Sequence, residues 1–180
     1  MNEKRVVDIR EVDGWDLNLL VARAKGLPVV GRALCYADPD DGHMTVDMDQ
    51  EVREDGFLKT EMLPVYVRNC VCDIADPESV KLFGHDWQCL EPVPDYVNDH
   101  GELWRILTES GISVMRSFQV NGEGFDWWTN GQPKEPGPRR WSYGEKDLAL
   151  AVLRQFIRDK SGANFFNIEK YFLENNNGTS

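Results

Sequence analysis

The chain lacks any long hydrophobic run. No apolar stretch in its 180 residues approaches the roughly 20 residues that a membrane-spanning helix requires. Residues 1–5 include charged side chains and have no apolar segment behind them, a pattern that does not fit a secretory signal. We therefore expect a protein that does not bind membranes and that resides in the cytoplasm.

Histidine is also scarce, and none of the three histidines has a catalytic context. His43, His85 and His100 lie in unrelated surroundings, so the sequence offers no grouping of His, acid and nucleophile that suits a hydrolase triad. The segment Gly122-Glu123-Gly124 falls in an expected hairpin turn with no helix directly after it, so it does not match a phosphate-binding loop. These absences predict that the protein is not an enzyme and carries no cofactor.

Basic residues are few relative to acidic ones. The chain has 20 Lys and Arg against 31 Asp and Glu, which gives a formal net charge of −11. This charge repels phosphates, so direct binding to nucleic acid is not expected. It fits either a generally solvated surface or an acidic face that meets a basic partner, for example by imitating nucleic acid.

Cysteine is limited to four residues. In a cytoplasmic chain we expect them to be buried free thiols rather than disulfides. The alternative is a zinc site, whose ligands would be Cys70, Cys72, His85 and Cys89. Their spacing matches no familiar zinc motif, so we predict no bound metal. The fourth cysteine, Cys35, lies in a strand-like segment.

The chain does have enough apolar material for a packed core. Hydrophobic residues make up 41% of the sequence and aromatic residues 11%, and the length suits one domain. We expect an α+β fold in which helices cover an antiparallel sheet, similar to an α/β/α sandwich. The domain is expected to span residues 1–174, with a flexible tail at 175–180.

Two helices are marked by clear end signals. The first is predicted over residues 15–25, with an apolar stripe and a stop at Gly26. The second begins with a capping box, in which Asp99 is followed three residues later by Glu102, and it ends at Gly111.

A third helix is predicted over about residues 145–160. Ser142 and Glu145 form a second capping box before it, and Gly162 follows its last turn. Two adjacent rows of apolar side chains run along it, which indicates a helix packed into the core.

Strand signals fill much of the remaining chain. A strand near 112–118 and a return strand at 125–130 flank the turn at 121–124, where Asn and Gly supply positive φ. Residues 5–12 and 64–72 have strand composition as well. Further candidates are strand-like residues at 29–30 and 33–36 and a short helix at 76–83.

An acidic segment lies in the middle of the chain. Residues 46–53 alternate apolar and mostly acidic side chains, so a strand there would turn a row of carboxylates outward. A solvated sheet face, a basic-partner site and a cation site are the alternatives; a calcium loop does not fit, because Gly42 falls at the wrong offset. The residues expected to contact a partner are Asp47, Asp49 and Glu51, together with Asp38, Asp40 and Asp41.

A second candidate site combines aromatic and basic residues. Trp127 and Trp128 are adjacent on a strand and therefore point to opposite faces, so one enters the core and one is exposed, unless helices bury both. The candidate ligand-binding residues are Trp128, Arg139, Arg140 and Trp141. Such a set could stack on and neutralise a small nucleotide.

The order of these elements resembles a known family. The segment 15–26 is similar to the opening helix of the phage proteins grouped as NinX-like, or phage ABA sandwich domain, proteins. The later segments 103–107, 112–114, 127–128 and 148–156 are similar to that family in order and spacing. The resemblance covers about 14–26 and 100–173.

The resemblance implies a phage or prophage origin, a sheet covered by helices and an accessory role, with no catalytic residues to carry over. Residues 28–98, which hold the acidic segment and all four cysteines, depart from the family and are predicted to be an insertion. We expect a phage accessory protein that blocks a basic host protein in the cytoplasm of an infected bacterium, as a counter-defence inhibitor. The alternatives are a protein that sequesters a small nucleotide signal, and a zinc protein or enzyme.

Overall fold

The computed structural model describes residues 5–38, 42–47, 60–68, 87–118, 124–131 and 144–168. These residues form a mixed α+β protein with helices packed on antiparallel strands, which confirms the expected α+β class. The chain forms two compact units. We call Gly26–Val93 the sheet unit, and Lys4–Lys25 with Pro94–Ile168 the helical unit.

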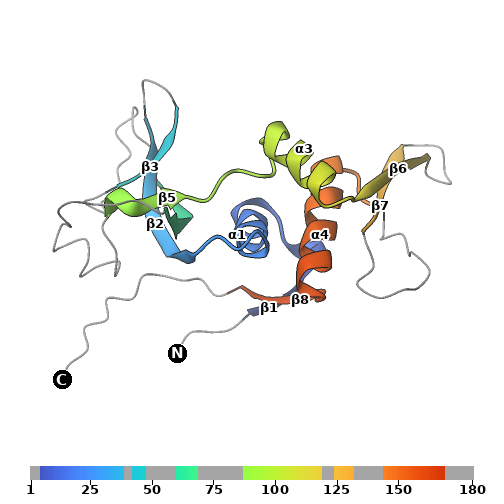
Figure 1. The fold of residues 1–180 in the computed structure, drawn as a ribbon, viewed down its shortest axis with the longest axis horizontal. Coiled ribbons are helices and arrows are strands. Elements are labelled where there is room, and N and C mark those ends of the chain that lie inside the picture. Colours follow the sequence, from blue (N-terminus) through green and yellow to red (C-terminus); the bar gives the residue numbers. More distant parts are fainter. Residues whose placement is uncertain are drawn as a thin grey trace. The chain divides into compact units, whose positions relative to one another are not determined.

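The helical unit is assembled around one central helix, α4 (Leu148–Ser161). Helices α1 (Gly14–Ala24) and α3 (His100–Glu109) contact α4, and so does strand β7 (Phe125–Asn130). Figure 1 shows α4 between α1 and the hairpin that β7 forms with β6 (Ser113–Phe118). Because α4 has neighbours on several sides, its buried residues include Arg154 and Gln155 as well as apolar side chains.

The end signals of the first two helices are confirmed. The Asp99 carboxylate accepts hydrogen bonds from the backbone N–H groups of Gly101 and Glu102, at 2.8 and 3.0 Å. Gly111 follows α3 with φ of +63°, and Gly26 follows α1 with φ of +82°. Only glycine adopts this left-handed conformation without strain, so both helices end where the sequence predicts.

The start of the third helix corrects the sequence prediction. Asp147, not Ser142, is the N-cap of α4, and its carboxylate accepts from the N–H groups of Ala149 and Leu150 at 2.7 and 3.1 Å. Glu145 is not helical, because its backbone forms a two-way β-bridge with Trp127. Ser142 lies outside the described residues.

The helical unit also contains two small antiparallel sheets. The predicted hairpin is confirmed: β6 pairs with β7 from Ser113↔Asn130 to Phe118↔Phe125. Strand β1 (Arg5–Asp8) pairs with β8 (Phe165–Ile168), which joins the two ends of the described chain. The predicted strand 5–12 is therefore shorter than expected, since a 3₁₀ turn, η1 (Ile9–Glu11), follows β1.

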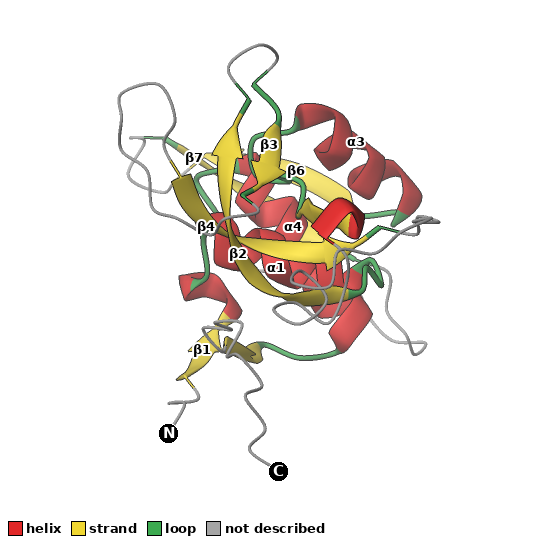
Figure 2. Cartoon of the chain, turned by 90° about the vertical axis from the view of Figure 1, so that its left-hand side faces the viewer, coloured by secondary structure: helices red, strands yellow, loops and turns green. Residues whose placement is uncertain are grey.

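The sheet unit is one four-stranded antiparallel sheet in the order β3-β2-β4-β5. Its strands are β2 (Val29–Ala37), β3 (Met44–Val46), β4 (Thr60–Val67) and β5 (Leu90–Pro92), the last preceded by the 3₁₀ turn η2 (Trp87–Cys89). The sheet curls like half a barrel, so that the edge strands β3 and β5 come into contact, and Figure 2 shows the curvature of β2 and β4. Its buried side chains include Ala33, Cys35, Val46, Leu63, Val65 and Leu90.

Several predictions concern residues that the structure does not describe. The short helix at 76–83, the tail at 175–180 and most of the acidic segment lie outside the described ranges. The α/β/α sandwich arrangement and the insertion of residues 28–98 into a single domain also stay predictions. Within the described ranges, no helix is long and apolar enough to cross a membrane.

Candidate functional site

The acidic segment is only partly described, and one of its residues is placed against expectation. Asp47 is 4% exposed, and its N–H donates a hydrogen bond of 2.8 Å to the carbonyl of Leu34 on β2. The prediction that the Asp47 carboxylate faces outward for a partner is therefore wrong. The physical reason is that β3 ends at Val46, so the alternation of inward and outward side chains does not continue through Asp47.

Asp38 holds the turn that joins β2 to β3. Its N–H donates to the carbonyl of His43 at 2.7 Å, and its carbonyl accepts from the N–H of Gly42 at 2.8 Å. The Asp38 side chain is half-buried. The remaining acids predicted to contact a partner, Asp40, Asp41, Asp49 and Glu51, lie outside the described residues.

The structure describes two cysteines, of which one is a free thiol and the other is disulfide-bonded. Cys35 is free and fully buried, as expected, and burial raises the pKa of its thiol to about 12, with a smaller effect from Asp47. Cys89 is disulfide-bonded, which corrects the expectation that it is a free thiol. A half-cystine offers no thiolate, so Cys89 cannot serve a zinc site while the bond is intact.

The other zinc candidates, Cys70, Cys72 and His85, lie outside the described residues. Within the described ranges, no three His, Cys, Asp or Glu side chains come together to hold a metal ion.

The paired tryptophans on β7 are both half-buried, so the structure matches neither expected alternative, one core and one exposed ring or two buried rings. The fully buried side chains of β7 are those of Thr129 and Asn130. Trp128 lies opposite Met115, which is 44% exposed, whereas Trp127 lies opposite Arg116. The Arg116 guanidinium stacks over Phe125 at 3.2 Å from the ring centroid. The candidate ligand residues Arg139, Arg140 and Trp141 are outside the described ranges.

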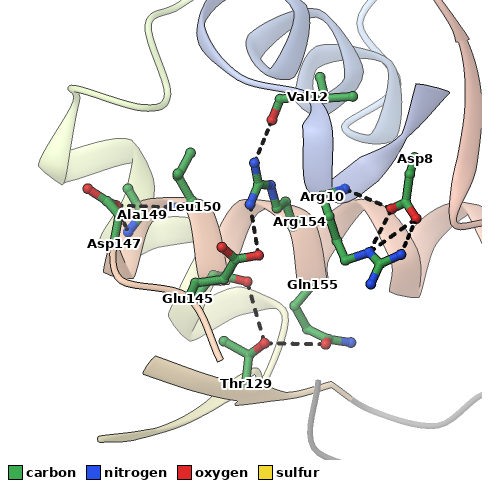
Figure 3. A network of polar contacts seen from close by, with 11 residues as sticks. Asp8, Arg10, Val12, Thr129, Glu145, Asp147, Ala149, Leu150, Arg154 and Gln155 are labelled. Carbon is green, nitrogen blue, oxygen red and sulfur yellow. Dashed lines mark hydrogen bonds and ion pairs between the residues drawn. The ribbon is translucent and has the colours of Figure 1, made fainter. Parts of the chain in front are cut away.

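A polar network crosses the interior of the helical unit along α4 (Figure 3). Arg154 donates from Nη2 to the carbonyl of Val12 at 2.9 Å, and its Nη1 lies 2.8 Å from Oε1 of Glu145. The two side chains are 7% and 20% exposed. Because Glu145 is also bridged to Trp127, Arg154 ties the segment before α1 to the segment that leads into α4.

A second branch of the network starts on β7. Thr129 donates from Oγ1 to Oε1 of Gln155 at 3.3 Å, and Gln155 donates from Nε2 to Oδ1 of Asp159 at 2.7 Å. Asp8, the last residue of β1, and Arg10 form a separate pair, whose hydrogen bonds hold the pKa of Asp8 at about 2. These groups hold one another and the backbone, so the network stabilises the helical unit.

A pocket of about 340 Å³ opens in the helical unit, between the C-terminal turns of α1 and α4 and strand β8. Its apolar lining is Leu20, Ala24, Ile157 and Phe166. Its polar lining is Arg23, Lys160 and Ser161, so the described lining includes two cations and no acid. This volume lies within the range of ligand pockets, near the lower limit.

Sequence reasoning missed this pocket. Arg23 and Lys160 are far apart in the chain, and a basic residue in a last helical turn is common because it compensates the helix dipole. The available signal was weak: each of two predicted helices has a basic residue beside its apolar stripe close to its C-terminal end.

The charge of the chain is divided unequally between its parts. The helical unit has 14 acidic and 14 basic residues, so its formal charges cancel. The sheet unit has 14 acidic residues against 5 basic ones, which leaves −9 of the total −11 on Gly26–Val93. The terminal residues 1–3 and 169–180 carry the remainder.

No protein-family model matches the chain, and neither the curated proteins nor the solved structures yield a match. The similarity to the NinX-like phage proteins therefore stays a prediction. The fold and the distribution of charge are the observations from which a function can be argued.

Proposed function

We propose that the protein acts by binding, and that the sheet unit engages a basic surface on a host protein and blocks it. The single observation that carries this proposal is the segregation of charge, because Gly26–Val93 hold a formal charge of −9 and the helical unit is neutral. If the negative charge served solubility alone, we would expect it to be distributed over both units. The family resemblance adds a phage origin, a counter-defence role in the cytoplasm of an infected bacterium and the α/β/α sandwich to the proposal.

The physical basis is electrostatic steering. A concentrated charge of one sign raises the association rate with a partner of opposite sign and disfavours acidic competitors. Its reach is set by ionic screening, with a Debye length of about 8 Å at physiological salt. Binding of this kind must therefore weaken when salt is raised.

The residues proposed to form the contact are the acids of 38–51, without Asp47. Asp47 is buried beside Cys35, so it is not available to a partner and its replacement would disturb the core. Asp38, Asp40, Asp41, Asp49 and Glu51 remain.

The test uses the full chain as bait in a bacterial lysate at low and high salt. The variant is Asp40→Lys with Asp41→Lys. The matched control is Glu11→Lys with Glu109→Lys, because both of these exposed acids belong to the helical unit and the change in net charge is the same.

We expect a stoichiometric partner that the wild type and the control retain at low salt, that high salt releases, and that the Asp40/Asp41 variant binds about tenfold more weakly. A partner held equally by all three proteins would refute the proposed surface. Recovery of no partner at either salt concentration would refute the proposed function.

A further inference from the structure

We propose that the pocket between α1, α4 and β8 binds a small amphipathic anion: an apolar chain or ring that ends in a carboxylate or phosphate. This site is independent of the acidic surface, because every described residue that lines it belongs to the helical unit. The two proposals can therefore fail separately.

The floor of the pocket supplies the apolar part of the site. Leu20 is 4% exposed and Ile157 is 1% exposed, so both are anchored in the core of the helical unit. Ala24 and Phe166 are half-buried at its walls. An apolar ligand group placed here would lose contact with water at little cost in rearrangement, since buried side chains already form the surface.

The rim supplies the positive charge. Arg23 comes from the last turn of α1 and Lys160 from the last turn of α4, and both residues are exposed. Arginine presents a planar fork that matches carboxylate and phosphate, while lysine contributes a point charge. Both of these rim side chains are positively charged, so an anionic head group is complementary to the rim in charge.

Ser161 does not add a nucleophile to this site. Its Oγ donates to the carbonyl of Ile157 at 2.7 Å and accepts from the N–H of Ala163 at 3.1 Å. The hydroxyl is thus engaged in ending α4, and its proton already has an acceptor. The chemistry of the pocket is therefore recognition rather than hydrolysis.

The volume of the pocket limits the size of the ligand. At about 30 Å³ for each water-sized group, 340 Å³ holds roughly eleven non-hydrogen atoms. Decanoate has 12 non-hydrogen atoms and octyl phosphate has 13, which is close to this number. They serve as probes that carry a carboxylate and a phosphate head group, respectively. Decanol, which has the same chain length as decanoate and no charge, separates the contribution of the head group from that of the chain.

The experiment is a calorimetric titration of the full chain with each probe. The test variants are Arg23→Gln and Lys160→Gln, which remove one charge each, and Ala24→Leu, which fills the pocket. The matched control is Lys146→Gln, because Lys146 is an exposed lysine of the helical unit that does not line the pocket. Thermal unfolding of each variant verifies that it is folded.

We expect decanoate or octyl phosphate to bind at least tenfold more tightly than decanol. Each charge-removing variant should weaken binding of the better anion about tenfold, Ala24→Leu should abolish it, and Lys146→Gln should leave it unchanged. Binding that survives Ala24→Leu, equal binding of decanol, or no binding of either anion would overturn the proposal.

Discussion

The guanidinium of Arg154 and the carboxylate of Glu145 form an ion pair of 2.8 Å inside the helical unit, with side chains 7% and 20% exposed. The pair connects α4 to the segment that Trp127 holds by a two-way backbone bridge. Removing one member of a buried pair leaves the other charge uncompensated, which typically costs about 3–5 kcal/mol. We therefore expect Arg154→Ala to lower the free energy of unfolding by about 3 kcal/mol, measured by urea denaturation.

The control for this prediction is Arg105→Ala. Arg105 forms a 2.6 Å pair with Glu102, but its side chain is 59% exposed, so the loss should be about 0.5 kcal/mol. The double variant Arg154→Met with Glu145→Leu should recover much of the lost stability, because no buried charge remains. Equal losses for Arg154→Ala and Arg105→Ala would contradict the view that Arg154 lies in a low-dielectric site.

The N-cap of α4 gives a second prediction. Asp147→Ala should reduce stability by about 1 kcal/mol, since the N–H groups of Ala149 and Leu150 would lose their acceptor. Asp147→Ser should retain most of the stability, while Ser142→Ala should have no effect. A larger loss from Ser142→Ala than from Asp147→Ala would mean that the helix begins at the capping box expected from the sequence.

The third prediction concerns Gly144, which precedes the bridge between Glu145 and Trp127. A Cβ at position 144 would lie 2.6 Å from Cβ of Asp126. The strands cannot separate to relieve this clash without losing the two Glu145–Trp127 hydrogen bonds, of 2.7 and 3.0 Å. Gly144→Ala should therefore cost about 2 kcal/mol, as overpacking does elsewhere.

Substitutions at Asp126 test whether its Cβ is the atom that clashes with a Cβ at position 144. Asp126→Ala retains Cβ and should not rescue Gly144→Ala, whereas Asp126→Gly removes the clashing atom and should. Chemical denaturation of the wild type, the three single variants and the two double variants gives one double-mutant cycle for each Asp126 substitution. Rescue by Asp126→Ala would show that the carboxylate, not the Cβ, is the obstacle.

The sequence predicts those parts of the fold whose signals are local. Asp99 and Gly111 mark the ends of α3, and the sequence Asn121-Gly122 predicts the β6–β7 hairpin, because capping and turn formation depend on a few adjacent residues. The pairing of β1 with β8 could not be predicted in this way. Neither strand has a pattern that identifies its partner, and the two strands lie at opposite ends of the described chain.

Glu145 shows how a tertiary contact overrides a local signal. The spacing of Ser142 and Glu145 fits a capping box, but the backbone of Glu145 pairs with Trp127 and its carboxylate pairs with Arg154. The candidate sites also differ in whether they depend on local sequence or on tertiary contacts. The charge imbalance is evident from composition, whereas the pocket that joins Arg23 to Lys160 exists only after the two helices meet.

A pH prediction follows from the cluster on β4 and β5. Tyr66 donates from its hydroxyl to Oε2 of Glu91, and Arg68 lies 2.7 Å from the other carboxylate oxygen. Burial, followed by the hydrogen bond to Glu91, raises the pKa of Tyr66 to about 12. The folded protein thus favours the neutral phenol, so its stabilising contribution is present below pH 10, the ordinary pKa, and is lost as pH rises toward 12.

The measurement is an ultraviolet titration of tyrosinate, with Tyr66→Phe to assign the signal among the five tyrosines. Glu91→Gln should lower the pKa of Tyr66 part of the way toward 10, because the charge is lost while burial remains. An unchanged titration in Glu91→Gln would attribute the whole shift to burial.

The last prediction concerns the thiols. Cys89 and one other cysteine form a disulfide, so two of the four cysteines should react with a thiol reagent when the protein is purified without reductant and denatured. All four should react after reduction. Cys35 is fully buried with a pKa of about 12, so it should be unreactive in the folded state at neutral pH. Native Cys35→Ser protein should therefore give the same count as native wild type, and one thiol fewer once denatured. Four reactive thiols before reduction would show that Cys89 is free and would restore it as a potential zinc ligand, because a thiolate, unlike a half-cystine, can bind the metal.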